Sequence, residues 1–418
     1  MNTCHVIYVG CHLTKDILIC KLIKDMFYTR EILSKLEKEL LTKEIIVLTG
    51  MRQIGKTTLL KHLFSLVASQ NKAIFDLENP LQRKIFEAEN YDAIWQGLAE
   101  FGLKNTERAF IFIDEMQNLP EISKVVKYLY DHYQVKFFLT GSSSFYLRNL
   151  FPESMAGRKI IFELSPLTFS EFLVFKGVSR EEAFDFEDKA KKKNRIAYEL
   201  YLPFYQEFMD YGGCPAVVLE KDYARKKELM QEIFTSYFEK DVRNLADFKE
   251  IGKLRDLILL LTARVGFRLD IGKLSQELAV SRETVYNYLT FLESTYFISL
   301  LPKFSGSLDR QAAGSKKLFF GDTGLANILG RLSMGQLFEQ SVFQNLRTRH
   351  KLFFYNRAER EEIDFVIDGK IGLEVKTSAG QRDYQKLERV SKKLGLAESY
   401  LTSFAYSEND QTILAIDL

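Results

Sequence analysis

The sequence of 418 residues has few cysteines, and their positions exclude two kinds of stabilising site. Three of the four, Cys4, Cys11 and Cys20, fall within the first twenty residues, and Cys214 stands alone. No two of them form a CxxC pair. The sequence therefore predicts neither a zinc site nor a disulfide framework, and a reducing cytoplasm is the expected location.

Long hydrophobic runs and a strong net charge are also missing. No run approaches the roughly 18–20 apolar residues that a membrane-spanning helix needs, so we expect no membrane association. The first twenty residues lack the basic segment and cleavage site of a signal peptide, and residues 1–25 are predicted to be an N-terminal extension. A formal net charge of +2 gives no overall attraction to nucleic acid, so any basic surface must be local.

The most specific motif is a nucleotide-binding loop in "KEIIVLTGMRQIGKTTLLKHLF", where a strand-like run leads into G-x-x-x-x-G-K-T and a helical pattern. The glycines let the backbone wrap around phosphates, which meet the amides of the helix's first turn. Lys56 is expected to neutralise the β- and γ-phosphates of ATP, and Thr57 to ligate Mg²⁺. The predicted nucleotide-binding residues of this loop are Gly50, Arg52, Gln53, Ile54, Gly55, Lys56, Thr57 and Thr58.

A second strand supplies acidic groups. In "RAFIFIDEMQNLP" five apolar residues precede Asp114 and Glu115, as expected for a buried parallel strand that ends at a functional edge. Asp114 is predicted to hold the Mg²⁺ shell, and Glu115 to polarise the attacking water. The alternative is a strand that ends in a solvated acidic turn.

From about Met26 to residue 172 the chain resembles the AAA-type P-loop ATPases of bacteria and archaea. The motifs that carry the resemblance are "GMRQIGKTTLL", "IFIDEMQNLP", "FLTGSSS" and "MAGRKIIFELSPLTFSEFL". It implies that Thr140 or Ser142 senses the γ-phosphate, with a capping role as the alternative. It also implies that Arg158 reaches a phosphate in its own or a neighbouring subunit, as a catalytic arginine finger, with a surface role as the alternative. An oligomer is compatible with the resemblance.

The middle of the chain predicts two further units. Residues 173–250 are expected to form a helical lid against the nucleotide domain, with a sharp turn at "YGGCP". Residues 251–325 follow the winged-helix plan of helix, short turn, helix and two strands, with Ser281 capping the second helix. That helix is expected to expose Arg282, Thr284, Tyr286 and Asn287. DNA contact and a packing role both remain open.

Residues 326–418 resemble the core of the PD-(D/E)xK nuclease superfamily. A helix in "MGQLFEQSVFQNLRTRH" places Glu339 in line with apolar residues, and two strands in "EIDFVID" and "IGLEVKTS" carry Asp364, Glu374 and Lys376. The carboxylates, Asp364 and Glu374 first, would hold a divalent metal on a scissile phosphate, and Lys376 would orient the water. The alternative is a fold retained for binding or assembly.

The predicted nuclease site depends on strand register. We expect a three-residue bulged turn at residues 367–369, which pairs Val366 with Lys370 and sets Asp364 opposite Gly372, diagonal to Glu374. A two-residue turn would place Asp364 on the other face of the sheet.

The fold class expected from the whole chain is α/β. It comprises a P-loop NTPase parallel sheet with a helical lid (residues 26–172 and 173–250), a winged helix, and a C-terminal restriction-endonuclease-like domain. One functional hypothesis is an ATP-hydrolysing machine that acts on double-stranded DNA. A second is an ATP-switched regulatory protein whose C-terminal half is a scaffold for protein partners, and a third is a protein remodeller.

Overall fold

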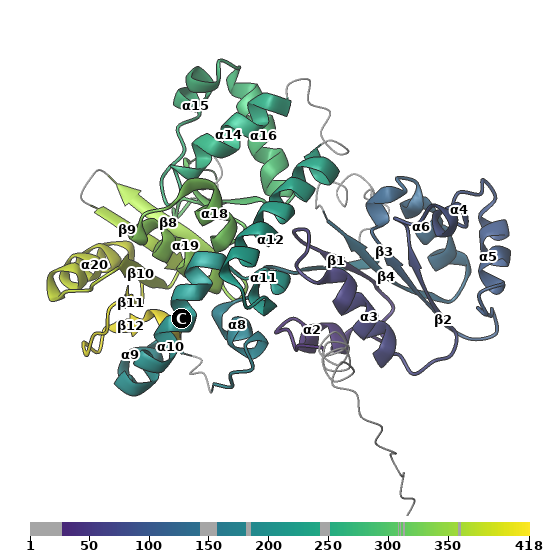
Figure 1. Ribbon diagram of the computed structural model, residues 1–418, viewed down its shortest axis with the longest axis horizontal. Coiled ribbons are helices and arrows are strands. Elements are labelled where there is room, and N and C mark those ends of the chain that lie inside the picture. The colour runs from purple at the N-terminus through teal and green to yellow at the C-terminus, as the bar shows by residue number, and fades with distance from the viewer. Residues whose placement is uncertain are drawn as a thin grey trace, which may run out of the picture.

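The computed structural model describes residues 27–142, 157–180, 185–242, 251–307, 309, 311, 314–357 and 361–418. The predicted extension 1–25 lies outside them. Figure 1 shows two sheets at opposite sides of the molecule, the N-terminal one at the right and the C-terminal one at the left, joined by a central group of helices. Among the described helices, none has the length and apolar character required to cross a membrane.

The N-terminal sheet has five parallel strands in the order β2-β3-β4-β1-β5. Strand β1 and its neighbour β4 are buried along their whole lengths, as expected for a parallel sheet that is covered on both faces. The strands are β1 (Ile45–Thr49), β2 (Lys72–Asp76), β3 (Ala109–Asp114), β4 (Val135–Gly141) and β5 (Lys159–Glu163).

The two faces of this sheet carry separate apolar cores, because successive side chains of a strand point to opposite sides. In β1, Ile46 and Leu48 belong to the core around helix α3, whereas Ile45 and Val47 belong to the core around α5 and α6. The helices of this part are α2 (Leu33–Lys38), α3 (Lys56–Leu66), α4 (Pro80–Lys84), α5 (Tyr91–Ala99), η1 (Met116–Asn118) and α6 (Ile122–His132).

Helix α2, the first helix of the described residues, is shorter than the sequence predicts. The amphipathic pattern indicates a helix from about Met26, but α2 begins at Leu33 and ends at Lys38. The side chains of Arg30 and Glu31, just before it, form long-range ion pairs with residues of other elements. Arg30 and Glu31 thus make tertiary contacts where the sequence pattern predicts a helix.

The range predicted as a lid, residues 173–250, includes central helices that contact both parts of the molecule. Helices α9 and α10 contact the C-terminal part, where Tyr205 and Phe208 of α10 share a core with Phe338. The π-helix η3 reaches the nucleotide-binding loop through the ion pair of Asp241 with Arg52. The helices of this group are α8 (Phe169–Phe175), α9 (Phe186–Lys191), α10 (Arg195–Tyr211), α11 (Pro215–Leu219), α12 (Tyr223–Ser236) and η3 (Tyr237–Val242).

A small helical unit with one hairpin follows, at the top of Figure 1. The Ser281 side chain accepts a hydrogen bond from the Thr284 amide and caps its last helix, as the sequence predicts. The elements are α14 (Ile251–Thr262), α15 (Ile271–Leu278), α16 (Arg282–Ser294) and the antiparallel strands β6 (Ile298–Pro302) and β7 (Lys316–Phe320).

The C-terminal sheet is mixed, in the order β12-β11-β10-β9-β8. Strands β8, β9 and β10 are antiparallel, and β10, β11 and β12 are parallel. The elements are α18 (Thr323–Gly330), α19 (Met334–Leu346), β8 (Leu352–Arg357), β9 (Glu361–Ile367), β10 (Ile371–Lys376), α20 (Gln381–Leu394), β11 (Glu398–Ser403), β12 (Thr412–Leu414) and η4 (Ala415–Asp417).

The β9–β10 register differs from the predicted one by two residues. Val366 pairs with Gly372, not with Lys370, and Ile367 pairs with Ile371 around a turn in which Asp368 and Gly369 both have positive φ. A shift of two residues leaves every side chain on the same face of the sheet. Asp364 therefore still lies on the face that the sequence predicts.

Candidate functional site

The nucleotide-binding loop joins the end of β1 to the start of α3 in a crowded place. Gly50 has φ +140°, and a Cβ added there would lie 2.1 Å from the Leu164 carbonyl oxygen. Gly55 is left-handed at φ +93°, directly before Lys56, the first residue of α3. Both glycines are therefore required by the backbone, one for close approach and one for its conformation. The loop leads directly into the first turn of α3, and the amides of a helix's first turn are suited to binding phosphate.

Lys56 lies within this loop, and among the described residues no carboxylate is in direct contact with it. Its Nζ donates hydrogen bonds to the carbonyls of Gly50 at 2.9 Å and Met51 at 2.8 Å. Burial lowers the pKa of Lys56 to about 8, while the charges of Glu115 and Asp241 act in the opposite direction. A buried ammonium held only by neutral carbonyls is suited to a bound anion.

The predicted acids lie at the carboxyl end of β3, each held by a neighbour. The Thr140 hydroxyl donates to Asp114, and the Glu115 amide donates to the same hydroxyl at 3.0 Å. Glu115 has the left-handed φ of +52°, and the Gln117 amide group donates to its carboxylate. Strained backbone at such a position is typical of functional residues. Thr140 thus positions the acids, and Gln117 is a supporting residue that the sequence analysis missed.

The donors near the loop suit Mg²⁺. Thr57, next to Lys56 on α3, and Asp114 offer the hydroxyl and carboxylate oxygens that this hard cation prefers. The fit rests on this donor chemistry alone. Of the other predicted loop residues, Ile54 is fully buried, whereas Gln53 and Thr58 are exposed.

Arg52 and Ser142 both turn toward an acid that the sequence analysis did not identify. Asp241 of η3 forms an ion pair with Arg52 at 2.5 Å and accepts a hydrogen bond from the Ser142 hydroxyl at 3.0 Å. Burial raises the pKa of Asp241, although Arg52 opposes this shift. A second contact, Lys240 with Glu78, also joins η3 to the N-terminal part. A π-helix is a signature of functional sites, but sequence patterns do not reveal one.

Arg158 cannot reach the nucleotide-binding loop of its own chain. Its carbonyl accepts a hydrogen bond from Ile45, at the start of β1, whereas the loop follows the other end of that strand. Its guanidinium pairs with Asp131 at 3.3 Å. A role as an arginine finger within one chain is therefore wrong, because strand direction separates the two. A role toward a neighbouring subunit stays a prediction.

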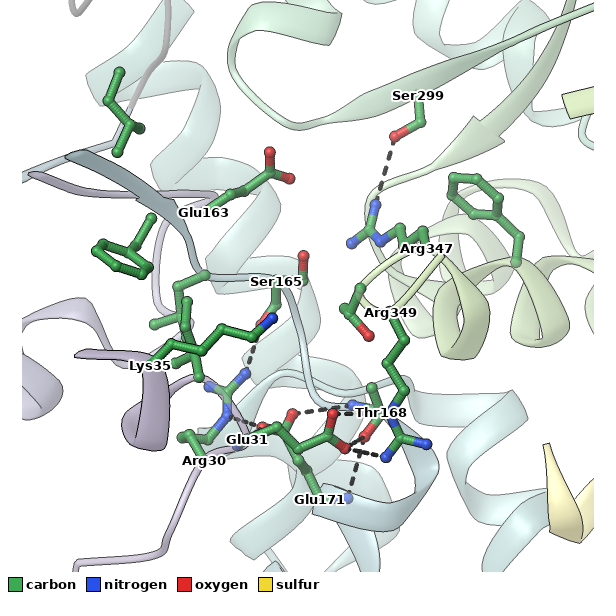
Figure 2. A pocket seen from close by; sticks show the side chains of 16 residues that line it. Arg30, Glu31, Lys35, Glu163, Ser165, Thr168, Glu171, Ser299, Arg347 and Arg349 are labelled. Atoms are coloured by element: carbon green, nitrogen blue, oxygen red, sulfur yellow. Dashed lines mark hydrogen bonds and ion pairs between the residues drawn. The ribbon is translucent and has the colours of Figure 1, made fainter. Parts of the chain in front are cut away.

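A cleft of about 550 Å³ separates the N-terminal part from the C-terminal one, and charged side chains cross one end of it (Figure 2). The Arg30 guanidinium donates to the Ile54 carbonyl of the nucleotide-binding loop at 3.1 Å and to Glu171 at 2.9 Å. The adjacent Glu31 pairs with Arg349, just beyond α19, at 2.5 Å. Two successive residues thus connect the loop to the C-terminal part.

Elsewhere in the cleft Glu163 and Arg347 approach from opposite sides, β5 and the end of α19 (Figure 2). Burial raises the pKa of Glu163, and the charge of Arg347 lowers it in part. Arg347 donates to the Gly321 carbonyl at 2.7 Å, so its guanidinium is anchored on the C-terminal side. The sequence analysis named neither residue.

The C-terminal strands bring the predicted acids to one face. Asp364 lies opposite Glu374 if the observed β9–β10 pairing is extended by one step, and the Val375 amide donates to Asp364 at 2.9 Å. Lys376 pairs with Glu374 at 2.8 Å. Burial and the charge of Asp364 raise the pKa of Glu374 to about 7. Asp364, Glu374 and Lys376 therefore converge, as the parity argument expects.

Glu339 joins this cluster through a residue that the sequence analysis overlooked. Lys317 of β7 places its Nζ 2.5 Å from Glu339 and 3.1 Å from Asp364. Burial and the charge of Asp364 raise the pKa of Glu339 to about 8, although Lys317 opposes the shift. Within the described ranges, no group of three or more His, Cys, Asp or Glu side chains is arranged to hold a metal ion. The strand alternation of "KKLFF" was the available signal for Lys317.

The last helix of the small unit, α16, presents the side chains that the sequence singled out, with one exception. Arg282, Tyr286 and Asn287 are exposed on α16, and Lys273 is exposed on α15. Thr284 is half-buried and its hydroxyl bonds to that of Ser281 at 2.9 Å, so it belongs to the cap.

Three family models match successive parts of the chain. Residues 42–173 match an AAA domain, residues 203–336 a domain of unknown function (DUF8612), and residues 334–416 a domain of unknown function (DUF4143). The first match contains the nucleotide-binding loop and the acids of β3. The last contains the acids of the C-terminal sheet.

Similar proteins span most of this chain. An uncharacterized protein of Methanocaldococcus jannaschii is 28% identical over 399 residues, which is 91% of this chain and 86% of that protein. An uncharacterized protein of Haemophilus influenzae is 26% identical over 78% of this chain and 80% of its own length. One of Mycobacterium tuberculosis is 25% identical over 84% and 74%.

Two solved structures show distant likeness to this chain. A chain of the Drosophila ORC bound to DNA has 13% identity and a TM-score of 0.32, over 72% of this chain and 94% of its own. AMPPCP-bound DnaA from Aquifex aeolicus has 12% identity and a TM-score of 0.29, over 64% and 88%. The family match and the loop and acids described above together support an AAA-type ATPase domain at residues 42–173.

Proposed function

We propose that this chain binds and hydrolyses Mg²⁺-ATP and uses the nucleotide cycle to control its C-terminal half. The observation that carries the proposal is the combination of a buried Lys56, bonded to the loop carbonyls of Gly50 and Met51, with two acids at the end of β3 in the same sheet. This is the arrangement that phosphoryl transfer to water needs, because catalysis there depends on positioning and charge stabilisation.

Each residue has a distinct part in hydrolysis. Lys56 holds the β- and γ-phosphates and stabilises their charge in the transition state. Glu115, fixed by Gln117 and by its own backbone conformation, orients the attacking water. Thr57 and Asp114 would hold Mg²⁺, which supplies neutralisation of phosphate charge. Thr140 keeps Asp114 in place, whereas Ser142 is tied to Asp241.

Two ion-pair routes support coupling of this site to the rest of the chain. Arg30 contacts the loop carbonyl of Ile54, and its neighbour Glu31 binds Arg349 of the C-terminal part. On the other side of the loop, Arg52 binds Asp241 of η3. A change of loop conformation on nucleotide binding would shift both routes, because each ends on the loop itself.

The finer proposal is that the chain acts on double-stranded DNA through residues 251–325 as a winged helix. Helix α16 exposes Arg282, Tyr286 and Asn287, and the strands β6 and β7 that follow it form an antiparallel hairpin, as a wing would. Exposed Arg and Lys side chains supply phosphate contacts, and an exposed Tyr supplies an apolar one.

The DNA proposal is tested by the salt dependence of binding. In the double variant Arg282→Ala/Lys273→Ala, two phosphate contacts are lost, so duplex affinity should fall and the slope of log K against log salt should flatten by about 2. Fluorescence anisotropy with a labelled duplex measures both quantities. Lys221→Ala/Lys227→Ala, in the α11–α12 region away from this unit, is the matched control. An unchanged slope would leave residues 251–325 as a packing unit.

For residues 326–418 we propose a PD-(D/E)xK-like fold that serves binding or assembly. The order of a helix, three antiparallel strands, a helix and a parallel strand supports this fold. The competing proposal is an active nuclease, and metal-dependent cleavage of duplex DNA that is lost in Lys376→Ala would establish it.

The central proposal is tested by steady-state ATP hydrolysis with and without duplex DNA. We expect Mg²⁺-dependent phosphate release from the full chain, and an increase when DNA is added if DNA is the partner. Release that DNA leaves unchanged favours the second function, an ATP-switched protein with protein partners. No phosphate release in either condition contradicts the proposal.

A further inference from the structure

Lys317 is the least expected residue of the C-terminal cluster, because it comes from the β6–β7 hairpin and not from the mixed sheet. In β7, successive side chains alternate between two cores: Leu318 and Phe320 face the helical one, and Phe319 faces the C-terminal one. Lys317 shares the face of Phe319, which stacks on Phe343 of α19 at 4.3 Å. A lysine at an apolar position that is only 2% exposed requires partners.

Its partners are the carboxylates on which metal binding would depend. The ammonium lies 2.5 Å from an oxygen of Glu339 and 3.1 Å from Oδ1 of Asp364. The other oxygen of Asp364 accepts the Val375 amide, so both oxygens of this carboxylate are engaged. Although burial opposes the charged form, Asp364 and Glu339 raise the pKa of Lys317 above its ordinary value.

The remaining carboxylate oxygens are similarly confined. The other oxygen of Glu339 lies against Gly266, where an added Cβ would be 2.6 Å away. Glu374 is paired with Lys376 through one oxygen, and its second oxygen is buried with no hydrogen-bond partner among the described residues. A divalent ion at Asp364 and Glu339 would meet an ammonium already between them. The cluster therefore does not fit a divalent metal in this arrangement.

We propose that the Lys317 ammonium takes the place of a divalent cation between Glu339 and Asp364, so that this cluster is a metal-free ionic lock between the β6–β7 hairpin and the C-terminal sheet. Three carboxylates face two ammonium groups, those of Lys317 and Lys376. The lock joins β7, α19 and β9, three elements far apart in the sequence. The inference concerns the C-terminal half alone and holds whether or not the chain hydrolyses ATP.

The test is Mn²⁺ binding to the full-length, nucleotide-free protein, followed by the electron paramagnetic resonance signal of free Mn²⁺. Lys317→Met keeps the length of the side chain and removes the charge. We expect this variant to gain a Mn²⁺ site at least about tenfold tighter than any in the wild type, because two carboxylates lose their cation. Adding Asp364→Asn to Lys317→Met should abolish the gain. Lys316→Met, one residue earlier and on the other face of β7, is the control and should gain nothing.

A second arm needs no change at Lys317. Wild-type protein and Asp364→Asn should bind Mn²⁺ identically, since the wild-type cluster holds none. Tight Mn²⁺ binding by the wild type that Asp364→Asn removes would overturn the proposal. So would a folded Lys317→Met variant, by circular dichroism, that gains no Mn²⁺ site. If Lys317→Met does not fold, the wild-type arm alone decides between the two outcomes.

Discussion

Two buried lysines in this chain, Lys56 and Lys317, have opposite surroundings. Lys56 donates to two backbone carbonyls, and the acids nearby are occupied elsewhere, Asp114 by Thr140 and Glu115 by Gln117. Lys317 is in direct contact with two carboxylates. Burial lowers the pKa of Lys56 to about 8, whereas the carboxylates raise that of Lys317.

The difference shows how the same residue types serve two purposes. A lysine whose carboxylates are turned to other donors keeps its charge for an anionic ligand. A lysine that is bonded to its carboxylates neutralises them, and both partners become structural. The contacts of the acids thus distinguish a phosphate site from an ionic lock, although each site contains a lysine and at least two carboxylates.

The largest expected effect is at Lys56. Lys56→Ala removes the ammonium inside the loop, so ATP turnover should fall by about 10³-fold or more and most nucleotide binding should be lost. Phosphate release and binding of a fluorescent ATP analogue measure the two effects. Lys61→Ala, an exposed lysine later in α3, is the control. Wild-type turnover in Lys56→Ala would contradict the assignment of Lys56 to the phosphates of ATP.

Glu115→Gln should separate binding from hydrolysis. The amide keeps the size of the side chain but cannot polarise water, so turnover should fall by about 10²–10³-fold while ATP affinity stays close to that of the wild type. The same two assays suffice, with Glu121→Gln on the exposed surface as the control. Turnover at the wild-type rate would mean that Glu115 does not act on the water.

Asp364→Asn should weaken the lock without touching the ATPase site. It leaves Lys317 with one carboxylate, and loss of one partner of a buried ion pair typically costs about 3 kcal/mol in the free energy of unfolding. Chemical denaturation measures the loss. Asp368→Asn, in the adjacent turn and more exposed, should cost less. Equal stability of Asp364→Asn and wild type would show that the lock contributes nothing.

The smallest effect is on the pH dependence of ATP affinity. Lys56 is charged below its pKa, so the lowered value of about 8 predicts full affinity below about pH 7 and weakening as the pH rises through 8. The dissociation constant for ATP should rise by up to about tenfold for each pH unit above the pKa of Lys56. Titration of the fluorescent analogue between about pH 6.5 and 9.5 follows it. A constant affinity across this range would contradict a lowered pKa.

Local patterns in the sequence predicted the local features well. The glycine spacing predicted the loop at Gly50 and Gly55, the apolar run before Asp114 predicted the acid-bearing strand, and Ser281 is the cap that was expected. Each of these depends on residues within a few positions of one another. The predicted three-residue turn between the strands of Asp364 and Glu374 also implied that these two side chains share a face of the sheet, although the observed pairing is shifted by two residues.

Features that depend on distant contacts were not predictable in this way. Asp241 meets Arg52 across 189 positions, and Lys317 meets Asp364 across 47. The helix expected from Met26 is shortened where Arg30 and Glu31 contact distant elements. That α9 and α10 bury their apolar faces against the C-terminal part also depends on distant contacts, and the lid against the nucleotide domain stays a prediction.

The most direct test of the account compares ATP turnover in Lys56→Met and Lys317→Met under identical conditions. Both variants remove one buried ammonium and keep the length of the side chain. The account predicts that Lys56→Met loses turnover and that Lys317→Met retains it, because only the first lysine faces phosphate. Turnover retained in Lys56→Met, or lost to the same extent in a folded Lys317→Met, would contradict the assignment of the two lysines.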